Sequence, residues 1–147
     1  MTAVELRVPG DPIPQGSMRW LPNKRMTDAN PRLHNWRARL SDGLATAISP
    51  DQPMTDPIYV WLDFFIRRPK GHYGAHGIRE RFRDARPAGR PDLDKLCRAV
   101  LDAATDAGVW RDDGQVVRLM AAKHWADDEQ PGVAIYIDER GPVVPHG

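Results

Sequence analysis

The sequence predicts a single domain that combines several strands with two main helices, and three observations support this fold class. Its 147 residues suit one domain with a core of its own, spanning 1–147. Strand-forming patterns cover 3–8, 58–67, 116–124 and 133–138. Apolar residues recur at helical spacing over 31–48 and 92–108.

The first strand and the first helix have clear local signals. Val4, Leu6 and Val8 alternate with polar residues, as in a strand with one buried face. Asn30–Pro31 is typical of a helix start, with the asparagine as N-cap. The apolar residues of this helix recur every three or four positions: Leu33, Trp36, Leu40, Leu44 and Ile48.

The segment 58–67 is dense in aromatic and β-branched residues. Its nearly continuous hydrophobicity predicts a central strand buried on both faces. Asp63 is its polar exception, and we interpret it as a structural hydrogen-bonding residue in preference to a metal ligand.

The second helix carries most of the acidic residues of interest. Its apolar stripe includes Leu96, Cys97 and Val100, and Asp92 falls near its N-cap. Gly108 suits a C-cap, after which Val109–Trp110 is predicted to return as a short edge strand. Asp102 and Asp106 are interpreted as ordinary surface charges.

Basic residues gather in two segments although the net charge is only +1. The segment 18–39 has six basic residues and one acid, and 67–90 has eight basic residues and two acids. Such asymmetry favours a surface that faces a polyanion. Residues 69–90 have no apolar period and predict a mobile basic loop, and 139–147 predict a flexible tail.

The cysteine content and the hydropathy of the sequence indicate where in the cell the protein is expected to be. Cys97 is the one cysteine, so it is expected to be a buried thiol in a reducing cytosol. No apolar run approaches the length of a membrane span, and a cytoplasmic location is expected.

Two pairs of aspartates flank the second helix: Asp92 with Asp94, and Asp112 with Asp113. Helix capping and turn formation account for one member of each pair. Clustered carboxylates next to basic segments favour Mg²⁺, with Mn²⁺ as a substitute, bound together with a substrate phosphate. The chemistry predicted is phosphodiester hydrolysis by metal-activated water.

The stretch PDLDKLCRAVLDAATDAGVWRDDGQVV resembles the signature of the RusA-type Holliday junction resolvases, and PIPQGSMR more weakly resembles their N-terminal segment. The resemblance implies an α+β fold with a mixed sheet against two main helices. It implies that Asp92, Asp94 and Asp113 bind metal and act in catalysis, and that Arg98 occupies the place of a catalytic or DNA-contacting lysine. Lys95 replaces the usual asparagine.

The same resemblance implies a homodimer that makes paired nicks in a four-way junction, as a crossover junction endodeoxyribonuclease of DNA recombination and repair. The alternatives are a branched-DNA-binding protein of this fold with impaired catalysis and, less favoured, a small-molecule phosphohydrolase. The residues expected to contact DNA are basic: Arg19, Lys24, Arg25, Arg67, Arg68, Lys70, Arg90 and Lys95.

Overall fold

The computed structural model describes residues 3–16, 18–20, 26–28, 31–49 and 51–140, and of 18–20 and 26–28 it describes the backbone only. The strands are β1 (Ala3–Pro9), β2 (Met18–Trp20), β3 (Met26–Asp28), β4 (Ile58–Ile66), β5 (Tyr73–Gly74), β6 (Gly77–Ile78), β7 (Val116–Trp125) and β8 (Gly132–Glu139). The helices are α1 (Arg32–Ala47) and α2 (Leu93–Asp106), with 3₁₀ turns at Lys70–His72, Glu80–Phe82 and Asp113–Gln115.

The main sheet has four strands in the order β1-β8-β4-β7. β8 pairs antiparallel with both β1 and β4, whereas β4 and β7 are parallel. The parallel pair follows from the connection between them, because the chain crosses back through α2 before it enters β7. The predicted α+β fold with a mixed sheet and two main helices is confirmed.

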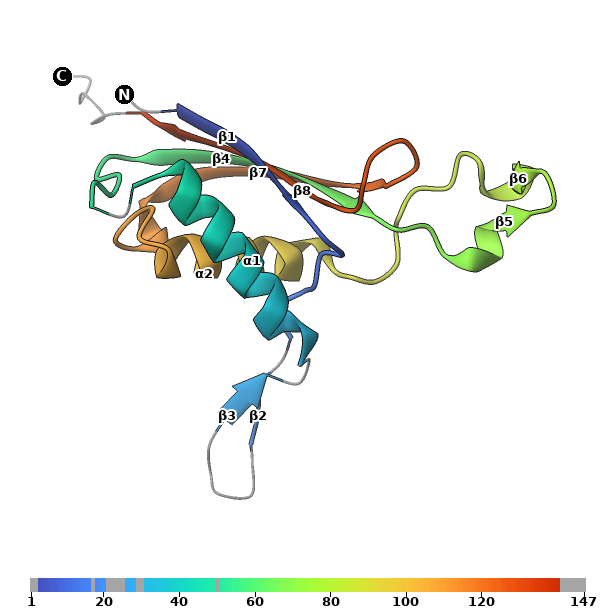
Figure 1. Ribbon diagram of the computed structural model, residues 1–147, viewed down its shortest axis with the longest axis horizontal. Coiled ribbons are helices and arrows are strands. Elements are labelled where there is room, and N and C mark those ends of the chain that lie inside the picture. The colour runs from blue at the N-terminus through green and yellow to red at the C-terminus, as the bar shows by residue number, and fades with distance from the viewer. Residues whose placement is uncertain (1–2, 17, 21–25, 29–30, 50, 141–147) are drawn as a thin grey trace.

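Both helices lie on the same side of the sheet (Figure 1). On α1 the buried residues are Leu33, Trp36, Leu40 and Leu44, which agrees with the predicted stripe. β4 is central as predicted, but the prediction that it is buried on both faces is wrong. Its buried residues alternate with half-buried ones from Ile58 to Phe65, because the helices cover only one face of the sheet.

On the other face, Asp63 lies beside β7. The Nε2 atom of His124 is 2.8 Å from Oδ1 of Asp63, and the His124 ring stacks on Phe65. This is the structural hydrogen bond expected of Asp63.

The end of α2 leads directly into the turn that carries Asp113. Gly108 has a φ of 77°, the left-handed conformation expected just after a helix. Trp110 is only 2% exposed and its indole N–H donates to Thr105 Oγ1 at 2.9 Å. The predicted edge strand at Val109–Trp110 is reduced to a single bridge between Trp110 and Met54, since the chain turns away at once.

Residues 69–90, which we call the arm, project beyond the sheet (Figure 1). The arm has local structure: the 3₁₀ turns Lys70–His72 and Glu80–Phe82 enclose the hairpin β5–β6. The His72 ring stacks on Phe82 with ring centroids 4.1 Å apart. The predicted mobility of the arm is a separate property and stays a prediction.

The predicted flexible tail begins at Glu139, and its flexibility stays a prediction. Glu139 belongs to β8, and its carboxylate accepts backbone N–H groups from Thr55 and Asp56. Residues 141–147 of the predicted tail lie outside the described residues. Within the described part of the chain, no helix is long and apolar enough to cross a membrane.

Candidate active site

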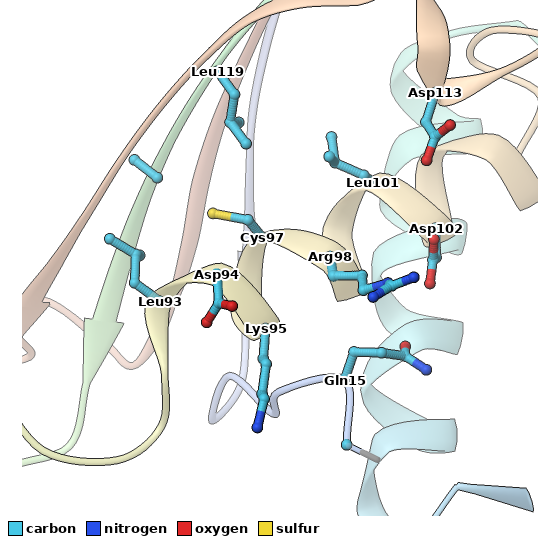
Figure 2. Close-up of a pocket in the computed structure, with 12 residues that line it drawn as sticks. Gln15, Leu93, Asp94, Lys95, Cys97, Arg98, Leu101, Asp102, Asp113 and Leu119 are labelled. Atoms are coloured by element: carbon cyan, nitrogen blue, oxygen red, sulfur yellow. The ribbon is translucent and has the colours of Figure 1, made fainter. Parts of the chain in front are cut away.

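An open cavity of about 1110 Å³ lies between α2, β7 and the segment that contains Gln15. Its acidic lining residues are Asp94 and Asp102 from α2 and Asp113 from the turn before β7. Arg98 lines the same wall (Figure 2). The structure therefore brings together three of the four predicted catalytic residues, namely Asp94, Asp113 and Arg98.

The spacing on α2 explains how these side chains reach one cavity. Asp94, Arg98 and Asp102 follow one another at four-residue intervals, so they share a helix face. The opposite face is buried against the sheet and α1 through Leu96, Val100 and other core residues. Packing of the apolar stripe thus directs the polar face toward the cavity.

Asp113 is positioned by Gln115, which fixes the turn between α2 and β7. The Gln115 side-chain oxygen accepts the backbone N–H groups of Arg111 at 2.9 Å and of Asp112 at 3.3 Å. Its amide donates to the carbonyl oxygen of Met54 at 2.9 Å. Gln115 therefore holds the turn that contains Asp112 and Asp113.

The start of α2 is held from two sides. Lys123 of β7 donates from Nζ to the carbonyl oxygens of Gly89 and Pro91, both at 2.8 Å. The backbone N–H of Gln15 donates to the carbonyl oxygen of Lys95 at 3.0 Å. The sequence alone does not predict a role for either residue, although a lysine within a strand such as β7 is a signal for one.

Asp92 is placed differently from the other predicted ligands. It lines a second cavity of about 660 Å³ together with Arg32, Arg90 and Lys95. Its Oδ2 atom lies 3.5 Å from Nζ of Lys95, and although it precedes α2 its side chain makes no capping hydrogen bond. Asp92 therefore lines the cavity next to that of Asp94, and Lys95 lines both.

The carboxylates of the cavity suit a divalent cation such as Mg²⁺. Among the described residues no group of three or more His, Cys, Asp or Glu side chains is close enough to hold a metal ion. Mg²⁺ commonly uses only one or two carboxylates and completes its shell with water and substrate phosphate. Asp94 and Asp113 each present a hard oxygen donor to the same cavity, with Asp102 as the acidic neighbour of Asp113 (Figure 2).

Asp102 corrects the sequence prediction, which took it for an ordinary surface charge. It is half-buried in the cavity wall, whereas Asp106 one turn later is exposed. Burial raises the pKa of the Asp102 carboxyl, while the positive charges of Arg37 and Arg98 lower it and the carboxylates of Asp113 and Asp106 raise it. Asp106 instead bonds to Arg37 of α1.

Cys97 is buried as expected, with its sulfur directed toward the sheet (Figure 2). Burial, with a smaller contribution from the charge of Asp94, raises the pKa of the Cys97 thiol to about 11. The thiol is therefore protonated at neutral pH and is a poor nucleophile, which leaves the chemistry of the cavity to its carboxylates and Arg98.

The predicted DNA-contacting residues occupy several environments. Arg67, Lys70, Arg90 and Lys95 are exposed. Arg68 is only 5% exposed, and its guanidinium bonds to Asp127 at 2.8 and 3.1 Å and to the carbonyl oxygen of Phe82 at 2.9 Å. This geometry favours a structural role for Arg68 at the base of the arm.

Three of the predicted DNA contacts cannot be placed. Arg19 lies in β2, of which the structure describes the backbone only. Lys24 and Arg25 lie outside the described residues.

Comparison with known proteins supports the resemblance found in the sequence. A family model described as "Endodeoxyribonuclease RusA" matches residues 9–138, which include every residue of the cavity named above. A protein of Bacillus subtilis (strain 168), described as "Uncharacterized protein YqaN", is 25% identical over 142 residues, which are 95% of this chain and 98% of that protein. The predicted family is confirmed: the chain belongs to the RusA endodeoxyribonuclease family, a family of Holliday junction resolvase nucleases.

Proposed function

We propose that the protein is a Mg²⁺-dependent, structure-selective endonuclease that cuts four-way DNA junctions by paired phosphodiester hydrolysis in recombination and repair. The observation that carries this proposal is the shared cavity of Asp94, Asp113 and Arg98 in a chain of this family. Carboxylates that could hold a cation and a guanidinium that could grip a phosphate face one space, as hydrolysis of a phosphodiester requires.

Each residue has a distinct task in this mechanism. Asp94 and Asp113 would hold the cation, with Asp92 contributing from the neighbouring cavity once DNA is bound. The bound cation would lower the pKa of a water molecule and offset charge at the phosphorus. Arg98 would stabilise the charge that develops on the phosphate oxygens, because a guanidinium stays protonated and is unsuited to proton transfer.

DNA would reach the cavity across its basic surroundings. Arg90 and Lys95 line the second cavity at the start of α2, and Arg67 and Lys70 lie exposed where the arm begins. These residues would contact phosphates of the junction arms, so binding should be shape-directed and sensitive to salt.

Substitution of Asp94 by Asn tests the nuclease function directly. We expect the wild type with Mg²⁺ to nick a synthetic four-way junction, and Asp94→Asn to bind the junction with unchanged affinity but without nicking, because only the cation site is changed. Gel-based cleavage and fluorescence anisotropy measure the two properties on the same labelled junction.

Two other outcomes would favour the alternatives. Tight junction binding without nicking by the wild type would favour a DNA-binding protein with impaired catalysis. The loss of catalysis would then be explained by the position of Asp92, which does not line the same cavity as Asp94. Turnover of a small phosphate ester without activity on DNA would favour a phosphohydrolase.

A homodimer is part of this function, because paired cleavage of two strands calls for two active sites related by a two-fold axis. The outer edge of β7 is the best-suited surface. β7 ends the sheet and carries three of the exposed large hydrophobic residues: Val117, Leu119 and Met120. Leu119 also lines the cavity, so pairing of two β7 edges would set two active sites close together.

Substitution of Met120 by Glu tests this interface. Met120 is 50% exposed, and we expect the charge to shift the protein from dimer to monomer in sedimentation velocity. Tyr73→Glu is the matched control, since Tyr73 is 44% exposed but lies on the arm. An unchanged dimer for Met120→Glu, or equal dissociation in both variants, would contradict the assignment of β7.

A further inference from the structure

Asp102 stands on the cavity face of α2, one helical turn beyond Arg98. In Figure 2 the guanidinium of Arg98 extends toward Asp102 and away from Asp94, which lies one turn before it. Among the described residues the two groups form no ion pair, but the charge of Arg98 lowers the pKa of Asp102, and residues four apart on a helix are neighbours on its surface. The acidic neighbour that Arg98 faces is therefore a residue outside the predicted catalytic set.

We propose that Asp102 is a positioning residue for Arg98: its carboxylate holds the guanidinium at the phosphate-binding edge of the cavity. This inference rests on the proposed nuclease function, in which Arg98 contacts the scissile phosphate. It assigns to Asp102 no contact with the phosphate or with the cation.

Physical considerations favour a separate partner for Arg98. A long, exposed arginine side chain loses conformational entropy when it is fixed at a phosphate, and a carboxylate that fixes it beforehand reduces that loss on binding. If Asp94 were the partner, the ion pair would draw charge from a carboxylate needed for the cation. Asp102, four residues on the other side, supplies the negative charge and leaves Asp94 to the metal.

The neighbouring aspartate offers a control for this idea. Asp106 lies one further turn along α2, is exposed, and bonds to Arg37 of α1. The charge of Arg37 also lowers the pKa of Asp102, but of the two aspartates it is Asp106 that bonds to Arg37. Only Asp102 lines the cavity, and an effect confined to Asp102 is therefore an effect on the active site.

The test is a double-mutant cycle on junction cleavage with Asp102→Asn, Arg98→Ala and the combined variant, beside Asp106→Asn as control. Removal of a charge-stabilising donor such as Arg98 should lower kcat by about 10²–10³-fold. We expect Asp102→Asn to lower kcat by about 10–100-fold, a range typical of an orienting partner, with an unchanged KM and an unchanged Mg²⁺ concentration at half-saturation. In the Arg98→Ala background, Asp102→Asn should have no further effect.

Stability and rescue measurements complete the design. Asp106→Asn should keep cleavage within about 3-fold of the wild type, a margin set by the modest value of surface ion pairs. Thermal unfolding midpoints of both Asn variants should match, and Asp102→Glu should regain part of the lost kcat, because it keeps the charge.

Several results would overturn the inference. An Asp102→Asn effect that persists in full without Arg98 would show that Asp102 acts independently, and a raised Mg²⁺ requirement would make it a metal ligand. Equal losses of kcat in the Asp102 and Asp106 variants would indicate that both residues act only by holding α1 and α2 together. These failures presuppose an active wild type, whereas a wild type that cuts no branched DNA would overturn the proposed function itself.

Discussion

Asp113→Asn is expected to lower Mg²⁺-dependent junction cleavage by far more than about a hundredfold, whereas Asp112→Asn leaves most of the activity. Partners in the outer shell of a metal site cost about 10–100-fold when removed, and a direct ligand should exceed that range. The two aspartates are adjacent in sequence and both exposed, but only Asp113 lines the cavity with Asp94 and Arg98. Asp112 begins the turn that Gln115 braces.

Single-turnover cleavage at several Mg²⁺ concentrations measures this difference, with circular dichroism to show that both variants are folded. A return of Asp113→Asn activity at high Mn²⁺ would agree with a role in metal binding. Equal losses in the two variants would contradict the assignment of Asp113 alone, and a larger loss for Asp112→Asn would reverse it.

Arg68→Ala is expected to lower the free energy of unfolding by about 2–3 kcal/mol, because it removes a buried guanidinium and leaves its partners unpaired. Arg68 bonds to Asp127 and to Phe82 and lies over the Trp125 ring, so it fastens the base of the arm to the sheet. Arg67→Ala is the matched neighbour. Arg67 is exposed and bonds to Asp11 at 3.3 Å, so its loss should change stability by no more than about 0.5 kcal/mol.

Urea denaturation measures the stability of the two variants, and junction binding over a series of salt concentrations measures their contact with DNA. We expect Arg67→Ala to weaken binding and to reduce the slope of log affinity against log salt. The prediction fails if Arg67→Ala is the more destabilising change, or if its affinity for the junction stays unchanged at every salt concentration.

The periodicity of the sequence was sufficient to predict the main elements of the fold. β1, β7 and β8 and both helices lie within a few residues of their predicted bounds, because strand-forming residues or a helical apolar period mark each of them in the sequence. The sequence wrongly predicts burial of both faces of β4, because Tyr59, Trp61 and Phe65 are hydrophobic although they lie on the face that the helices leave uncovered. Those aromatic side chains pack against one another and against neighbours on an uncovered face.

The site was harder to predict, for reasons of three-dimensional placement. Helical spacing put Asp94, Arg98 and Asp102 on one face, but only the packing of α2 against β7 shows that the face borders a cavity. Asp92 and Asp94 look equivalent in sequence, yet they line two adjoining cavities, and Lys95 lines both. Arg67 and Arg68 look equally basic, yet Arg68 is buried against Asp127, Phe82 and Trp125 while Arg67 is exposed.

The short stretch 123–127 bonds both to the chain just before α2 and to the two ends of the arm. Lys123 holds the carbonyl oxygens of Gly89 and Pro91 just before α2, Trp125 donates to the carbonyl oxygen of Ala85, and Asp127 pairs with Arg68 at the other end of the arm. The arm and the start of α2 are therefore both bonded to the same short stretch of chain. Lys123 bonds beside the start of α2, whereas Trp125 and Asp127 bond to the two ends of the arm, so a displacement of the arm would be passed through this stretch to the helix that carries Asp94.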